Sequence, residues 1–148
     1  MKMGFVSSIL ENYSFEEVIN FASEHGFSCV ELASWKKEKA ERRYAGVSHL
    51  DAEGLTDEKA QYILDYCKNR NVEISSLAYY PNTMDSDLEK RKANIDHLMS
   101  VIDASAKLGI NMVTTFIGRN QYKTVDENLA ELESVWRPII EHAESKKV

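Results

Sequence analysis

The feature that most constrains this chain is a pattern that recurs four times, in which a short apolar run is followed by a helix with one apolar face. The four runs are predicted to be β-strands: Met3–Ser8, Cys29–Ala33, Val72–Tyr80 and Met112–Ile117. Strands that alternate with helices in this way build parallel sheets through right-handed crossovers. The chain is therefore predicted to be an α/β protein made of four strand–helix (βα) units.

The helices are marked by their ends and by their periodicity. Three are expected to begin with a capping box and one with a single capping threonine: Ser14/Glu17, Ser86/Glu89, Thr124/Glu127 and Thr56. Apolar residues then recur at the i, i+3, i+4 and i+7 spacing of a core-facing stripe. Gly26 and Gly109 are expected to end the first and third helices, and Pro138 to kink or split the last one.

Composition excludes several classes of protein. The 148 residues are 43% apolar, which is enough for one domain with a core, and the net charge of −6 disfavours nucleic-acid partners. Cys29 and Cys67 are too far apart for a zinc motif and are interpreted as reduced thiols. No signal peptide or membrane-length apolar segment is present, so a cytoplasmic location without membrane partners is expected.

The predicted sheet is incomplete. Four parallel strands would leave two unpaired edges and one poorly covered face. Lys146–Val148 stands where a fifth strand would begin, so residues 1–148 are interpreted as a single partial (β/α)4 domain truncated before strand five. Either more chain or a partner would have to complete the sheet.

Active groups in parallel α/β folds lie just past the carboxyl ends of the strands. That rule selects a set of mostly polar and aromatic residues: Ser7, Ser8, Glu31, Ser34, Trp35, Tyr79, Tyr80, Asn82, Phe116, Gly118 and Arg119. Aromatic rings could stack on a sugar, asparagine could bond hydroxyls, and arginine could hold an anion. For Tyr80, Asn82 and Arg119 function is favoured over packing, whereas for Tyr79 the two are balanced.

The histidines and the charged segments offer few further candidate functional residues. His49 lies in the long loop after the second strand and is the one histidine with an even balance between function and structure; the other three are expected to be structural or exposed. No clustered His/Asp/Glu set predicts a metal site within this chain. The basic run Lys36–Arg43 could steer a phosphorylated substrate, but a solvated helical face is favoured. No glycine-rich phosphate loop follows the first strand.

Three segments carry a family resemblance: Val47–Asp51, Ser75–Asn82 and Thr114–Arg119. They are similar to the N-terminal half of the sugar phosphate isomerase/epimerase family, which has the xylose isomerase-like TIM barrel, and the match spans essentially the whole chain. The resemblance implies the N-terminal half of a (β/α)8 barrel involved in carbohydrate metabolism. It also implies a parent enzyme in which a divalent metal (Mn, Mg, Zn or Co) and paired glutamates move a proton through an enediolate.

The family's metal ligands come mainly from strands five to eight, so no catalytic or metal-binding residue can be transferred to this chain, which alone is expected to be inactive and to bind no metal. The resemblance transfers only the substrate-binding wall: Trp35, His49, Tyr80, Asn82, Phe116 and Arg119. It implies a sugar or sugar phosphate as ligand, and a C-terminal half-barrel or a homo-oligomer that completes the barrel. The alternatives are a non-catalytic binding or interaction module and a dehydratase-type lyase; an abasic-site endonuclease is disfavoured by the acidity.

Overall fold

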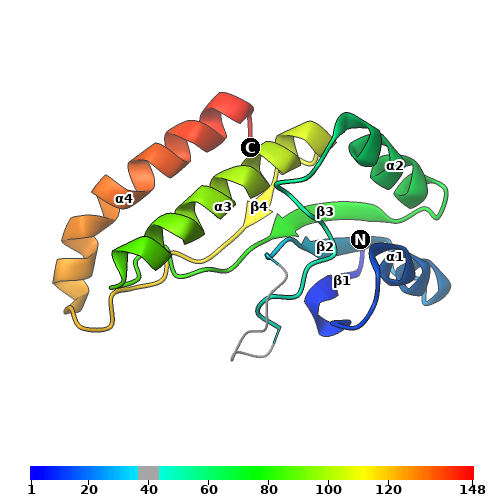
Figure 1. Ribbon diagram of the computed structural model, residues 1–148. Coiled ribbons are helices and arrows are strands. Elements are labelled where there is room, and N and C mark those ends of the chain that lie inside the picture. The colour runs from blue at the N-terminus through cyan, green and yellow to red at the C-terminus, as the bar shows by residue number, and fades with distance from the viewer. Residues whose placement is uncertain (37–43) are drawn as a thin grey trace.

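The computed structural model describes residues 1–36 and 44–148, so most of the basic run at 36–43 lies outside the described residues. The strands form one parallel sheet in the order β1-β2-β3-β4: β1 (Gly4–Val6), β2 (Cys29–Ala33), β3 (Glu73–Ala78) and β4 (Val113–Thr114). Four α-helices alternate with them: α1 (Phe15–Glu24), α2 (Asp57–Lys68), α3 (Leu88–Leu108) and α4 (Val125–Lys146) (Figure 1). The predicted α/β class with four βα units is confirmed.

Three of the four strands are shorter than predicted, whereas β2 has the predicted bounds. The first strand stops at Val6 because Ser7–Ile9 form a turn of 3-10 helix, η1. The Ser7 hydroxyl there accepts a hydrogen bond from the Ala33 amide at 2.8 Å, which ties η1 to the end of β2. On the other side of the sheet, β4 pairs only through Val113 and Thr114, opposite the last two residues of β3.

The helix starts confirm most of the capping predictions. Ser14 and Thr124 form complete capping boxes, and Thr56 accepts from the amide of Lys59. The predicted box at Ser86 is wrong, because Asp87 caps α3 by accepting from the amides of Glu89 and Lys90. A carboxylate satisfies two of the amides that a helix leaves unbonded at its start, which explains why it is preferred to the preceding serine.

The last helix bears on the expectation that Pro138 would kink or split it. Pro138 lies inside α4, which continues from Val125 to Lys146, so the helix is not split. The next residue, Ile139, is buried in the core. Gly26 and Gly109 adopt the positive φ angles expected of residues that end helices.

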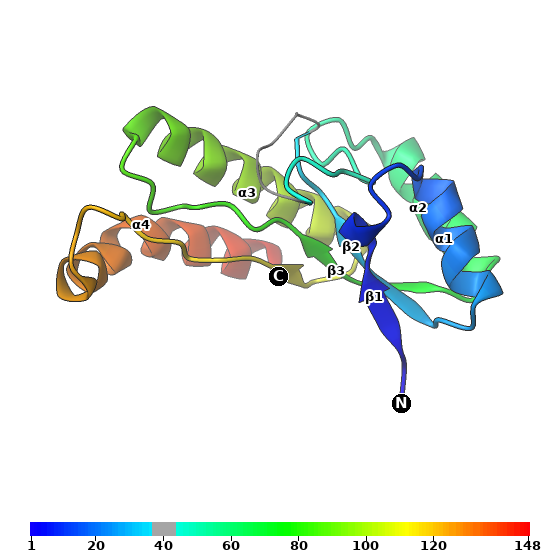
Figure 2. The ribbon, with the colours of Figure 1, turned by 90° about the horizontal axis from the view of Figure 1, so that it is seen from below.

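The core lies between the sheet and the helices. Val30, Leu32 and Leu77 of the strands are fully buried against the apolar stripes of the helices, which include Ile19 and Leu98. Figures 1 and 2 show α1, α2 and α3 on one side of the sheet. Side chains alternate along a strand, so the residues between the core positions point to the opposite face.

The structure also bears on the two cysteines and on the search for membrane-spanning segments. Cys29 and Cys67 are both unbridged, and burial raises the pKa of the Cys67 thiol to about 11, which makes it unreactive at neutral pH. Within the described part of the chain, no helix combines the length and apolarity that crossing a membrane requires.

Candidate functional site at the carboxyl ends of the strands

A partly buried hydrogen-bonded cluster occupies the face of the sheet opposite the helices. Glu31 lies between the core residues Val30 and Leu32 and therefore points away from the helices. Its carboxylate accepts a hydrogen bond from the Ser76 hydroxyl at 3.0 Å and another from the Tyr80 phenol. The three side chains form the Glu31 cluster, which joins β2 to the end of β3.

The sheet register creates this cluster. A bulge between β2 and β3 shifts the pairing between Val30 and Glu31, so that Glu31 lies opposite Ser76 instead of Ser75. Glu31 was selected by the strand-end rule but was not among the predicted substrate-binding residues. The signal that could have singled it out is its charge between two core residues, which requires a polar partner on the other face.

Tyr80 links the cluster to an exposed aromatic ring. Burial, followed by the hydrogen bond to the Glu31 carboxylate, raises the pKa of the Tyr80 phenol, so the hydroxyl stays protonated and acts as a donor. The rings of Tyr80 and Phe116 lie 4.6 Å apart at an angle of 40°. Phe116 is 55% exposed just past β4, so the pair presents an apolar surface beside a carboxylate.

Asn82 and Arg119 are joined through the backbone. The Asn82 side chain accepts from the Arg119 amide and donates to the Arg119 carbonyl, both at 2.9 Å. Gly118 makes this approach possible, because its φ is +75° and a Cβ there would lie 2.0 Å from the Asn82 Oδ1. We call this contact the Asn82 clasp. It connects the loop after β3 to the loop after β4, and the Arg119 residue at its end is exposed.

Trp35 and Tyr79 pack together beside this end of the sheet. The Trp35 ring meets the Tyr79 ring edge-on at 4.9 Å. Tyr79 is buried, contacts the His97 ring at 4.6 Å, and donates its hydroxyl to Asn94. Of the two roles left open for Tyr79, the structure therefore supports core packing.

His49 is buried near the first βα unit. Its Nδ1 lies 2.9 Å from the Ser7 hydroxyl and its Nε2 lies 3.3 Å from the Leu10 carbonyl. These bonds fix the ring against η1. Among the residues predicted to form the substrate-binding wall, Tyr80 contacts Phe116 and Asn82 contacts Arg119. The hydrogen bonds of His49 instead join it to Ser7 of η1 and to the carbonyl of Leu10, which follows η1.

The remaining histidines have the structural settings expected of them. His97 is 2% exposed and is held between Glu53, at 3.0 Å, and the Ser34 carbonyl, at 2.8 Å. His25 stacks on Phe21 at the end of α1.

The residues of this site do not fit a metal ion. Over residues 1–36 and 44–148, no three His, Cys, Asp or Glu side chains come together as a metal site would require. The Glu31 carboxylate is engaged by two hydroxyl groups. What the site can offer a ligand is a hydrogen-bonding carboxylate, an aromatic surface and the exposed Arg119 cation.

Comparison with known proteins places this fold in a family. The chain belongs to the family of the xylose isomerase-like TIM barrel, whose model matches residues 19–148. None of the curated proteins compared with the chain matches it in sequence.

Solved structures match over the whole chain at low identity. D-psicose 3-epimerase from Clostridium cellulolyticum H10, solved with D-tagatose, has a TM-score of 0.68 and 15% identity, and the match covers 100% of this chain and 50% of the other. The probable 3-DHS dehydratase AsbF of Bacillus anthracis has a TM-score of 0.67 and 20% identity, and the match covers 100% of this chain and 50% of the other. The IOLI protein, solved with a bound zinc atom, has a TM-score of 0.69 and 17% identity, and the match covers 100% of this chain and 49% of the other.

The chain spans about half the length of the solved structures it matches. The prediction of a half-barrel, four βα units of a (β/α)8 TIM barrel, is therefore confirmed.

Proposed function

We propose that this chain forms the substrate-binding wall of a metal-dependent sugar or sugar phosphate isomerase or epimerase, and that a second half-barrel completes the site. The observation that carries the proposal is the Glu31 cluster with the exposed Phe116 ring at the carboxyl ends of the strands. TIM-barrel enzymes have their active sites at this end. The match to half of a D-psicose 3-epimerase supports the choice of reaction.

Each wall residue has a role that suits its chemistry. Tyr80 and Phe116 would pack against the apolar face of a sugar, and Arg119 would bind an anionic group such as a phosphate. Asn82 would hold the Arg119 backbone in place through the Asn82 clasp. Trp35 and His49 would border the site on the side of β2 and η1.

A divalent metal would have to be bound by residues of the complementary half, because the described residues offer no ligand set. The zinc in the IOLI protein supports metal use in the completed barrel. The chain alone would be inactive. The unbridged thiols of Cys29 and Cys67 support a cytoplasmic location, which is part of the proposal.

A dehydratase-type lyase is the second candidate. The match to the probable 3-DHS dehydratase has the same coverage as the match to the epimerase from Clostridium cellulolyticum H10 and a similar TM-score, so the fold alone does not separate the two reactions. Product analysis separates them, because a lyase releases water and forms a double bond whereas an epimerase preserves the composition of the sugar.

The test begins with the coding sequence after the Val148 codon, where in-frame βα units are expected to supply the complementary half. The completed protein is then assayed on ketohexoses with Mn²⁺ and with a chelator. We expect Arg119→Ala to weaken sugar binding more than it lowers the melting temperature, with Lys68→Ala on the distant α2 as control. Unchanged kinetics together with a lower melting temperature would contradict the assigned role.

A further inference from the structure

His97 of α3 is a buried histidine whose two ring nitrogens both face hydrogen-bond acceptors. Its Nδ1 lies 3.0 Å from the Glu53 carboxylate, and its Nε2 lies 2.8 Å from the Ser34 carbonyl. A carbonyl oxygen can only accept a hydrogen bond, and the same holds for an ionised carboxylate. Both contacts are therefore satisfied only when each ring nitrogen carries a proton.

The Glu53 carboxylate is ionised at neutral pH. Hydrogen bonds from Lys36 and then from His97 lower its pKa below the ordinary 4.5, although burial acts to raise it. The Lys36 ammonium lies 2.8 Å from the same carboxylate oxygen that His97 contacts. A neutral His97 ring would turn the lone pair of one nitrogen toward an acceptor and leave a buried contact unmade, which costs free energy. The geometry therefore requires an imidazolium.

The same ring is joined to three successive residues at the end of β2. It donates to the carbonyl of Ser34, and this carbonyl belongs to the peptide group that continues into Trp35. The Tyr79 ring contacts both aromatic neighbours, with centroids 4.6 Å from the His97 ring and 4.9 Å from the Trp35 ring. Lys36 is joined to His97 through the carboxylate that they share.

We propose that His97 is a positioning residue which, as an imidazolium, fixes residues 34–36 and so sets the place of the Trp35 ring. This inference rests on the proposed function in one respect, that Trp35 borders the sugar site. It adds a residue of α3 that no strand-end rule selects. Hydrogen bonds from a charged group are short and directional, so they fix a segment more strictly than apolar packing alone.

Ring-nitrogen NMR on the full chain tests the charge. In a protein labelled with 15N, an imidazolium shows two protonated ring nitrogens, whereas a neutral ring shows one protonated and one unprotonated nitrogen. At neutral pH, His97 is expected to show two protonated nitrogens. A neutral His97 ring in the wild-type protein would overturn the inference.

Glu53→Gln separates the charge from the contact. The Glu53 side chain is half-exposed, so its replacement opens no cavity in the core. The substitution removes the negative charge, and burial then disfavours a charged ring at His97. A neutral ring can still donate to Ser34 and accept from the glutamine amide. His97 is therefore expected to lose one proton in this variant while Trp35 stays in place.

Glu53→Ala removes the contact as well. Trp35 is followed by fluorescence in a Trp136→Phe background, which leaves it as the one tryptophan of the sequence. Acrylamide quenching of Trp35 is expected to rise above its value in Glu53→Gln. The Ser34 amide is expected to exchange roughly ten-fold faster than in wild type, the factor for losing a hydrogen bond to a charged group. Unchanged quenching in Glu53→Ala would overturn the positioning role.

Asp57→Ala is the matched control. Asp57 also bridges to α3, through Lys107 at 2.8 Å, so the control removes the same charge four residues from Glu53. It is expected to leave the His97 spectrum and the quenching of Trp35 as in wild type, and a Trp35 response equal to that of Glu53→Ala would overturn the inference. These measurements use no sugar, metal or second half-barrel, so failure of the proposed enzymatic function would leave their outcome unaffected.

Discussion

At the residue scale, the Glu31 carboxylate of β2 accepts hydrogen bonds from Ser76 of β3 and from Tyr80 just after it, and so links the two strands on the face of the sheet away from the helices. A glutamate between Val30 and Leu32 must point away from the core, and this follows from the alternation of a strand. Its partner Ser76 does not follow, because the choice between Ser75 and Ser76 depends on a bulge in the pairing with β3. Local patterns therefore predicted which residues lie at the strand ends, but not how their side chains are bonded.

The Glu31 cluster predicts a measurable change in the titration of Tyr80. Burial and the Glu31 carboxylate raise the phenol pKa above its ordinary 10.0, so the folded state loses stability as pH rises from about 10 through the folded pKa. In Glu31→Gln, the pKa of Tyr80 is expected to fall part of the way, because burial remains. Ultraviolet titration against Tyr80→Phe isolates this phenol, and an unchanged Tyr80 titration in Glu31→Gln would refute the assignment.

The Asn82 clasp predicts a large difference between two glycines with the same backbone conformation. Gly118 and Gly26 have φ of +75° and +76°, so alanine at either position incurs the left-handed penalty of roughly 1–2 kcal/mol. Only at Gly118 would the Cβ meet another atom, the Asn82 Oδ1. Urea unfolding is expected to show Gly118→Ala as the more destabilised variant, whereas equal losses would mean that the clasp can yield without cost.

At the element scale, the order and type of the elements were predictable because each helix has both a start signal and an apolar stripe. Two predicted capping boxes, at Ser14 and Thr124, are present in full. The third prediction failed because Ser86 and Asp87 are adjacent and both can cap a helix, and spacing to Glu89 favoured the wrong one. The β4 strand was predicted too long because its ends depend on pairing, which a single strand does not encode.

The corrected cap of α3 can be tested by substituting the two neighbours in turn. Asp87→Ala is expected to cost about 1 kcal/mol of unfolding free energy, because two amides lose their acceptor. Ser86→Ala is the matched control and is expected to change stability by only a few tenths of a kcal/mol. Chemical denaturation of both variants makes the comparison, and a larger loss for Ser86→Ala would restore the original capping box.

At the scale of the whole molecule, α4 is fastened to α3 at both ends by ion pairs. Near the start of α4, Glu131 contacts Arg91 of α3 at 2.7 Å and Lys123 at 2.6 Å. Near its end, Asp103 of α3 contacts His142 and Lys146 at 3.0 and 2.8 Å. The pairs that join α3 to α4 are long-range in sequence, so helix patterns gave no sign of them.

These ion pairs predict that acid loosens α4 from α3. Hydrogen bonds from Lys123 and then Arg91 lower the pKa of Glu131, and the pKa of Asp103 is lowered by Lys146 and His142, although its burial acts to raise it. Their stabilisation is present above the ordinary values of 4.5 and 3.8 and is lost as pH falls through the folded pKa values. The rate of amide hydrogen exchange in α4, corrected for the intrinsic effect of pH on exchange, is therefore expected to rise as the pH is lowered from about 6 to about 3.

The double variant Glu131→Gln with Asp103→Asn provides the control for this prediction. Without the two carboxylates, the protection of α4 is expected to be low at both pH values, so the pH dependence should largely disappear. An equal acid response in the variant and the wild type would show that other groups fasten the helix.

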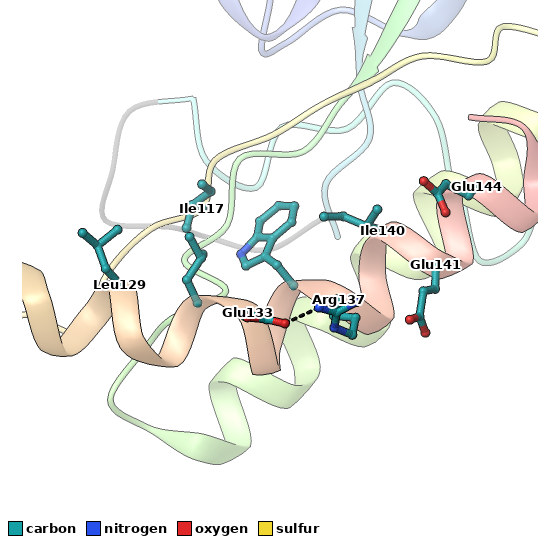
Figure 3. Close-up of a pocket in the computed structure, with 9 residues that line it drawn as sticks. Ile117, Leu129, Glu133, Arg137, Ile140, Glu141 and Glu144 are labelled. Atoms are coloured by element: carbon teal, nitrogen blue, oxygen red, sulfur yellow. Dashed lines mark hydrogen bonds and ion pairs between the residues drawn. The ribbon is translucent and has the colours of Figure 1, made fainter.

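The half-barrel itself illustrates the limit of local patterns. Four βα units and an unfinished sheet followed from periodicity, but the barrel to which they belong was suggested only by resemblance and was established by the family model and the solved structures. The exposure of Leu129 and Ile140 on α4 (Figure 3) could not be predicted from the sequence either, because both residues have the spacing of a buried stripe.

The Asn82 clasp has a consequence for how a ligand would be received. With two hydrogen bonds across the loops that follow β3 and β4, those loops should move as one body instead of as two separate flaps. A rim that is already ordered before binding loses little conformational entropy when a small molecule arrives. Affinity at this side of the barrel should therefore depend on the fit of the molecule to a preformed shape and little on loop closure.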